Sequence, residues 1–194
     1  NAQNNSLTPF EKGNKNQSTT YEECVSFYQL LDPNSDKIEM KTMGLTDSGK
    51  PLHIVIFSEN KDFSFNQNKA VLLVNNGIHP GEPDGIDATM MLMRDLANSK
   101  IKVPKSTIVV AIPVYNMEGM LNRKSFSRAN QNGPEAYGFR GNGRNYDLNR
   151  DFIKSDTKNS RSFQELFHTV NPDVFLDNHV SNGADYQYTF TCIA

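Results

Sequence analysis

The stretch AVLLVNNGIHPGEPDGIDATMMLMRDLANS, residues 70–99, decides the fold class. It opens with a continuous apolar run, AVLLVNN, which is typical of a strand that is covered on both faces. From Asp84 onward, Ile86, Met90 and Met93 recur at helical spacing, which predicts a helix with one buried face. A buried strand that leads directly into a helix is the repeating pattern of α/β proteins.

The rest of the chain alternates between strands and helices in the same way. Thr20 and Glu23 form a capping-box pattern at a helix start, and Val25, Tyr28 and Leu31 form its expected buried stripe. We expect a helix at 20–31, two strands joined by a turn within 38–58, further strands at 70–76, 106–116 and 173–181, and helices at 84–99 and 160–170. The pattern predicts an α/β fold with a mixed, largely parallel central sheet flanked by helices.

Three segments stand outside this pattern. Residues 1–19 are rich in Asn, Gln, Ser and Lys, so we expect a flexible N-terminal arm followed by one domain at 20–194. Residues 116–150 form a long loop rich in Asn, Gly and Arg, and such loops are usually functional or disordered. The opening letters NAQNNS look like a mature N-terminus after signal removal, which indicates a secreted or periplasmic protein.

Composition narrows the classes of partner. The net charge is −2 and no basic cluster is present, so we expect no nucleic-acid partner. No apolar run approaches the ~20 residues of a membrane-spanning helix. The two cysteines, Cys24 and Cys192, form no CxxC pair, so we expect no thiolate zinc site. Their pairing and the oligomeric state stay open.

Histidine and glutamate follow two of the predicted buried strands. His79 and Glu82 lie on a turn rich in Gly and Pro after the strand at 70–76, and His179 lies near the end of a later strand. Ligands of α/β sheets bind beyond the carboxyl ends of the strands. Two imidazoles and one carboxylate at a shared rim predict a catalytic zinc site. For the short motif alone, the alternative is a solvated loop.

Two further histidines and an arginine-rich run complete the set of candidate residues. His53 and His168 fit structural or surface roles, and we expect neither to bind metal. The run GFRGNGRNYDLNRDF contains Asn149 and Arg150. An arginine guanidinium can form bidentate hydrogen bonds with a carboxylate. Three more arginines lie in the same loop: Arg128, Arg140 and Arg144. They suggest an anionic substrate end, and a solvated basic loop is the alternative.

At these motifs the sequence resembles the zinc metallocarboxypeptidase family (the M14 peptidase group), from about residue 37 onward. HPGEPDG, GNGRNYDLNRDF and TDSGKPLHIVIFS resemble bacterial-type members in particular. The resemblance implies a three-layer sandwich and zinc-dependent hydrolysis of the C-terminal peptide bond of peptides, with a metal-bound water as nucleophile. It also implies that His79, Glu82 and His179 hold one Zn²⁺, and that Asn149 and Arg150 clamp the terminal carboxylate.

The resemblance implies two supporting roles as well. Asp147 would accept a hydrogen bond from a zinc-bound histidine, with His79 as the first candidate, and so fix its tautomer. The carbonyl-polarising arginine best matches Arg128, although the irregular loop spacing leaves Arg123 and Arg140 as alternatives.

The chain departs from the family pattern after His179. The family's general base is a downstream glutamate, yet residues 180–194 contain none, and neither Tyr186 nor Tyr188 fits the family's pocket tyrosine. We therefore expect a C-terminally truncated, incomplete enzyme. Two other functions stay open: an N-acyl amino acid deacylase of the succinylglutamate desuccinylase and aspartoacylase type, acting on a small carboxylate substrate, and a zinc-bearing peptide-binding module without turnover.

Overall fold

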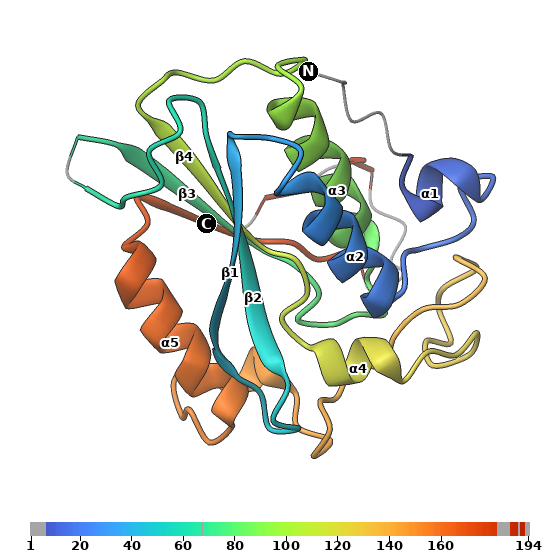
Figure 1. The fold of residues 1–194 in the computed structure, drawn as a ribbon. Helices are drawn as coiled ribbons and strands as arrows, with labels where there is room; N and C mark the ends of the chain where they lie inside the picture. The colour runs from blue at the N-terminus through green and yellow to red at the C-terminus, as the bar shows by residue number, and fades with distance from the viewer. Residues whose placement is uncertain (1–6, 67, 182–186, 190, 193–194) are drawn as a thin grey trace.

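A central sheet with helices on both faces forms the fold (Figure 1). The computed structural model describes residues 7–66, 68–181, 187–189 and 191–192. In chain order the elements are α1 (Pro9–Lys12), α2 (Tyr21–Leu31), β1 (Ile38–Leu45), β2 (Pro51–Ser58), β3 (Ala70–Asn75), α3 (Asp84–Ala97), β4 (Thr107–Ile112), α4 (Met117–Leu121), the 3-10 helix η1 (Leu148–Arg150), α5 (Lys158–Val170) and β5 (Val174–Asp177).

The sheet has five strands in the order β1-β2-β4-β3-β5. Strand β3 pairs in parallel with both β4 and β5, whereas β2 pairs antiparallel with β1 and β4. The predicted mixed sheet is confirmed, and its parallel part is β4-β3-β5. Because these three strands run the same way, their carboxyl ends meet at one rim of the sheet.

Successive side chains along each strand point to opposite faces of the sheet, so the interior has two hydrophobic cores, one on each face. Val109 and Ala111 of β4 face α2 and α3, while Val110 and Ile112 face α5. Figure 1 shows α2 and α3 on one side of the sheet and α5 on the other. The three-layer arrangement follows from this period of two, because a central strand such as β4 buries side chains on both faces.

Helix α2 begins where the sequence predicts it. Thr20 accepts from the amide of Glu23, and the Glu23 carboxylate accepts from the Thr20 amide. Its buried face comprises Cys24, Phe27, Tyr28 and Leu31. Our expected stripe was therefore wrong at Val25, which is only half-buried, because the positions that share the buried face are set by Cys24 and Phe27.

The described part of the N-terminal segment packs against the domain. Thr8 and Glu11 cap α1 reciprocally, and Glu11 forms a salt bridge with Arg94 of α3, with 2.6 Å between Oε2 and Nη1. Arg123 donates to the backbone oxygens of Ser18 and Thr19. These contacts involve part of the segment 1–19 for which we expect a flexible arm; residues 1–6 lie outside the described residues, and the division into an arm and a domain at 20–194 stays a prediction. The contacts connect residues far apart in sequence, so local composition does not reveal them.

Strand β5 is less buried than we predicted. Val174, Phe175 and Leu176 are 57%, 38% and 41% exposed, because β5 is the last strand of the sheet in the part of the chain that the structure describes. The expectation of a third buried strand was therefore wrong.

Among the described residues no helix is long and apolar enough to cross a membrane. Both cysteines carry free thiols: Cys24 is buried, and Cys192 is exposed.

A buried carboxylate joins the N-terminal segment to α3. Asp87 is 5% exposed and accepts a hydrogen bond from the Thr19 amide, with 3.1 Å between N and Oδ1. Burial raises the pKa of Asp87 to about 7; the nearby charge of Asp84 adds to this, and the Thr19 amide opposes it. The folded chain thus binds this proton more tightly than the unfolded chain.

This raised pKa predicts a pH-dependent stability. The contribution of Asp87 is most favourable below its ordinary pKa of 3.8 and is lost as the pH rises to about 7. Asp87→Asn keeps an acceptor for Thr19 without the charge. The wild type should lose up to about 4 kcal/mol of this stabilisation between pH 4 and pH 8, whereas Asp87→Asn should not. The free energy of unfolding of the variant, relative to that of the wild type, should therefore rise by this amount over the same range. Urea unfolding in EDTA measures this, and a difference that does not change with pH would contradict it.

Candidate active site

The parallel strands β3 and β5 bring the candidate ligands to one rim. His79 and Glu82 lie on the turn between β3 and α3, and His179 lies two residues beyond the end of β5. The Glu82 amide donates to the His79 backbone oxygen at 2.9 Å, which closes the turn and points both side chains the same way. His79 and Glu82 are 3% and 5% exposed, and the His179 side chain is 33% exposed.

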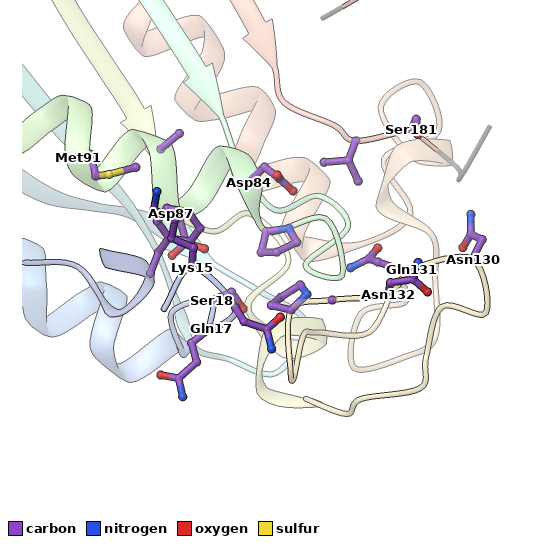
Figure 2. Close-up of a pocket in the computed structure, with 17 residues that line it drawn as sticks. Lys15, Gln17, Ser18, Asp84, Asp87, Met91, Asn130, Gln131, Asn132 and Ser181 are labelled. Atoms are coloured by element: carbon purple, nitrogen blue, oxygen red, sulfur yellow. The ribbon is translucent and has the colours of Figure 1, made fainter. Parts of the chain in front are cut away.

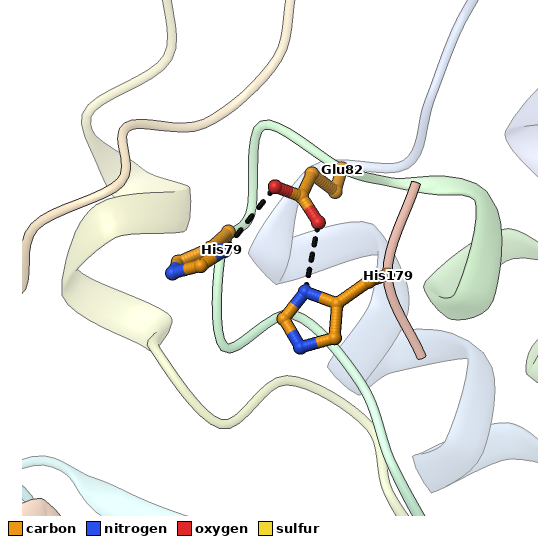
Figure 3. Close-up of side chains that lie close together, drawn as sticks. All are labelled: His79, Glu82 and His179. Atoms are coloured by element: carbon orange, nitrogen blue, oxygen red, sulfur yellow. Dashed lines mark hydrogen bonds and ion pairs between the residues drawn. The ribbon is translucent and has the colours of Figure 1, made fainter. Parts of the chain in front are cut away.

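The Glu82 carboxylate lies between the two imidazoles (Figure 3). Its Oε1 is 3.2 Å from His79 Nδ1, and its Oε2 is 2.9 Å from His179 Nδ1. The amide of Val180 also donates to Oε2, at 3.1 Å, and Arg128 donates from Nη1 to Oε1 at 2.7 Å. The structure thus brings together all three residues that the sequence singled out as a zinc site.

Each imidazole contacts a second carboxylate through Nε2, on the side of the ring away from Glu82. His79 Nε2 is 3.0 Å from Asp147 Oδ1, as the resemblance implied, and His179 Nε2 is 3.0 Å from Asp177 Oδ2. Each ring therefore turns Nε2 outward and Nδ1 toward Glu82. Sequence reasoning missed Asp177. Its only signal was its place two residues before His179, on the same strand edge.

Hydrogen bonds within the cluster shift the pKa values of its carboxylates and of His179. Burial acts to raise the pKa of Glu82, but hydrogen bonds from His179 and His79 outweigh it and hold that pKa well below its usual range. Hydrogen bonds to Asp177 and Glu82 raise the pKa of His179 to about 9. Burial also acts to raise the pKa of Asp147, and bonds from His79 and Arg140 reverse this. The cluster therefore stabilises a positive charge next to Glu82.

The donor set fits a zinc ion. One ligand atom from each of His79, Glu82 and His179 lies within 4.8 Å of the others. Two imidazole nitrogens and one carboxylate oxygen are a ligand set of catalytic zinc sites. Carboxylates behind metal-binding imidazoles fix the tautomer that leaves the other nitrogen free for the ion. These residues could hold zinc through Nδ1 of each histidine and a carboxylate oxygen of Glu82.

Arg128, in the long loop, contacts the ligand cluster through Glu82. Its Nε is buried and has no hydrogen-bond partner among the described residues. Gly81 makes this placement possible: a Cβ there would come within 2.8 Å of Arg128 Cδ and 2.9 Å of the Gly138 oxygen. A larger residue at position 81 would displace the arginine stem.

The two alternative arginines have other partners. Arg123 donates to backbone oxygens of Ser18 and Thr19, so it holds the N-terminal segment. Arg140 donates through Nε and Nη2 to Asp147 Oδ2, at 3.0 and 2.9 Å, and its Nη1 is 3.5 Å from His79 Nδ1. Arg140 therefore supports the carboxylate behind His79.

The Asn149–Arg150 pair lies in η1, and Asp147 is the N-cap residue of this short helix. Asp147 Oδ1 accepts from the Asn149 amide at 3.0 Å, so one aspartate both caps η1 and contacts His79. Arg150 is exposed, and its Nη1 donates to the Asn149 backbone oxygen. Among the described residues it forms no ion pair within 4.0 Å. Its guanidinium is therefore available for a ligand carboxylate.

Figure 2 shows a cavity of about 600 Å³. It is bordered by Pro83 and Val180, the neighbours of Glu82 and His179 in sequence. Its walls come from the N-terminal segment, the start of α3 and the loop at 130–134. This volume lies in the ordinary range of ligand pockets and could take part of a peptide.

The other histidines lie away from the cluster. His53 on β2 is 3.3 Å from Thr42 Oγ1, and burial lowers its pKa. His168 is exposed in the last turn of α5. Of the two tyrosines considered, Tyr188 is 71% exposed, whereas Tyr186 lies outside the described residues.

Comparison with known proteins identifies the family. Residues 25–180 match the family model described as zinc carboxypeptidase. Carboxypeptidase 2 of Trichophyton tonsurans is 28% identical over 115 residues, which cover 58% of this chain and 19% of that protein. Carboxypeptidase 2 of Trichophyton rubrum is 27% identical over 109 residues, which cover 55% and 18%. The chain belongs to the zinc carboxypeptidase family.

Solved structures share the fold. A metallo-carboxypeptidase from Burkholderia cenocepacia matches with a TM-score of 0.66 at 16% identity, over 87% of this chain and 43% of that chain. The carboxypeptidase A from Helicoverpa armigera matches with a TM-score of 0.65 at 18% identity, over 84% and 46%. The chain spans about a fifth of the length of the curated relatives it matches and less than half of these two structures.

The geometry of the cluster predicts which histidines retain zinc. His179→Ala should abolish zinc retention, because it removes one of three ligands. His168→Ala is the matched control and should retain one zinc per chain, because this side chain is exposed and distant in the fold. Metal analysis after dialysis against metal-free buffer measures both. Loss of zinc from His168→Ala would contradict the ligand assignment.

Proposed function

We propose that this protein is a zinc-dependent carboxypeptidase that removes the C-terminal residue of peptides. The observation that carries the proposal is the convergence of His79, Glu82 and His179 on one point. Asp147 connects this point to the asparagine–arginine pair, because it contacts His79 and directly precedes the short helix that carries the pair. Membership of the zinc carboxypeptidase family supports the same reaction.

In this proposal His79, Glu82 and His179 hold the ion. Bound zinc would lower the pKa of a water molecule and polarise the scissile carbonyl. Arg128 is the residue that we assign to the carbonyl oxygen, because its buried Nε has no partner in the described protein and the guanidinium already reaches the ligand cluster. A donor placed where negative charge develops lowers the barrier.

Arg150, with Asn149, is assigned to the terminal carboxylate of the substrate. The exposed guanidinium can form the paired hydrogen bonds that fit a carboxylate. Such a clamp fixes which peptide bond reaches the zinc, so it selects the last bond of the chain. Residues 180–194 contain no glutamate, and the proposal assigns no general base.

Substrate comparison tests the reaction class. A peptide with a free C-terminus should lose its last residue, and chelation of the metal should stop the reaction. The same peptide as a C-terminal amide should react far more slowly, because Arg150 then has no carboxylate to bind. Preferential cleavage of an N-acyl amino acid would select the deacylase instead. Zinc and peptide binding without turnover would select a binding module.

The clamp also predicts a selective effect of Arg150→Ala. Loss of a charge-assisted hydrogen bond of about 1.5–3 kcal/mol should weaken binding of the free-acid peptide by about 10- to 100-fold. Binding of the amidated peptide should change little. Titration calorimetry of the zinc-loaded protein measures both affinities.

The matched control is Arg144→Ala, an exposed arginine in the same loop that stacks over the Tyr146 ring at 4.7 Å. It should leave both affinities within about twofold. Equal losses on the acid and the amide in Arg150→Ala would remove the clamp from the proposal.

A further inference from the structure

Asp177 links the sheet to His179. It ends strand β5, and in the parallel register it is paired with Asn75 at the end of β3. Its Oδ2 is 3.0 Å from His179 Nε2, while its Oδ1 accepts from Asn75 Nδ2 at 3.0 Å. The two carboxylate oxygens thus have separate partners, because one contacts the imidazole and the other is held by the neighbouring strand.

Asn75 places an amide side chain in the core between the ends of β3 and β5. It is completely buried, and its side-chain Oδ1 has no partner among the described residues. A buried polar atom without a partner costs about 1–3 kcal/mol of stability. The side-chain bond that the structure shows for Asn75 goes to Asp177. Its presence in the core is therefore explained by the position of Asp177 rather than by stability.

The backbone around Asp177 is held as well. The Asn178 amide donates to the Asn75 oxygen at 3.0 Å, and the Asn178 side chain donates to Asn76 Oδ1 at 2.8 Å. A Cβ on Gly85 would come within 2.5 Å of Asn178 Cβ, so glycine lets α3 approach this segment closely. Two hydrogen bonds to the end of β3 and a close helix contact thus fix the chain just before His179.

The arrangement repeats on the other side of the cluster. His79 Nε2 meets Asp147, and Asp147 is held by Arg140. An imidazole can rotate about its Cβ–Cγ bond and present a different edge, so a ring held only by its ligand bond is loosely oriented. A carboxylate on Nε2 keeps the proton there and leaves Nδ1 toward the metal position.

We propose that Asp177 is a positioning residue that keeps Nδ1 of His179 turned toward Glu82, and that Asn75 holds Asp177 in place. This inference rests on the proposed zinc site. It assigns to the second histidine a hydrogen-bonded chain that starts in the sheet, Asn75–Asp177–His179, alongside the chain Arg140–Asp147–His79.

Zinc affinity of the whole chain tests the proposal without any assay of turnover. Competition with a chromophoric chelator should show Asp177→Ala binding zinc about 10- to 100-fold more weakly than wild type. Asp177→Asn should lose less, because it keeps an acceptor oxygen but not the charge. The matched control is Asp173→Ala at the other end of β5. Asp173 also bonds to β3, through the Val71 amide at 2.7 Å, but contacts no histidine among the described residues.

Asn75→Leu separates positioning from stability. Leucine has a similar volume and removes the unpartnered oxygen, so the metal-free protein should unfold at a temperature no lower than wild type. Zinc affinity should nevertheless fall, because Asp177 loses its anchor. A purely structural Asn75 would shift both quantities in the same direction. The double variant Asn75→Leu, Asp177→Ala should bind zinc no more weakly than Asp177→Ala alone.

The outcomes separate this inference from the proposed function. Normal zinc affinity in Asp177→Ala, with zinc lost in His179→Ala, would overturn the positioning role and leave the zinc site standing. Equal zinc losses in Asp173→Ala and Asp177→Ala would also overturn it. Zinc retained in His179→Ala would overturn the zinc site itself. If Asp177→Ala does not fold, Asn75→Leu alone decides between a positioning role and none.

Discussion

The site depends on one buried carboxylate. Glu82 is 5% exposed, and its two oxygens meet four hydrogen-bonding groups, from His79, Arg128, His179 and Val180. An isolated carboxylate in this position would be strongly destabilising. These partners come from three segments: the turn after β3, the long loop and the exit of β5. Glu82 therefore keeps three distant parts of the chain in contact at one rim.

Sheet topology makes this convergence possible. Because β3 and β5 are parallel neighbours, the residues that follow them emerge at the same edge. Asn116, just after β4, ties the loop to this edge, because its side chain donates to the backbone oxygens of Ile78 and Arg140. The loop then returns Asp147 to His79 and places Arg150 in solvent. A rigid rim and an anchored loop together preorganise the candidate ligands.

Much of this could be predicted from sequence. Buried strands and amphipathic helices have local periodicities, so α2, α3, α5, the strands and the mixed sheet follow from short windows. The short helices α4 and η1 lie in the segment 116–150, which we expected to be a loop. The grouping of His79, Glu82 and His179 also follows, because each lies just beyond a strand end. The element predictions need only local sequence, whereas the grouping of the three residues also requires that β3 and β5 run in parallel, as they do.

The rest depended on contacts across the chain. Spacing within the loop could not show which of Arg128, Arg123 and Arg140 contacts Glu82, because the partners of each arginine are set by how the loop folds back onto the domain. Asp177 gives no local signal of its role, since that role depends on the register between β3 and β5. The exposure of β5 depends on its place as the last of the described strands, and an apolar run does not encode the order of strands in a sheet.

The most direct test of the account is the structure of the protein crystallised with zinc, with the ion located by anomalous scattering at the zinc edge. The account predicts one ion bound by Nδ1 of His79, Nδ1 of His179 and the carboxylate of Glu82, at roughly 2.0–2.2 Å from each. An ion that lies elsewhere, or one bound by only one of the two imidazoles, would contradict it.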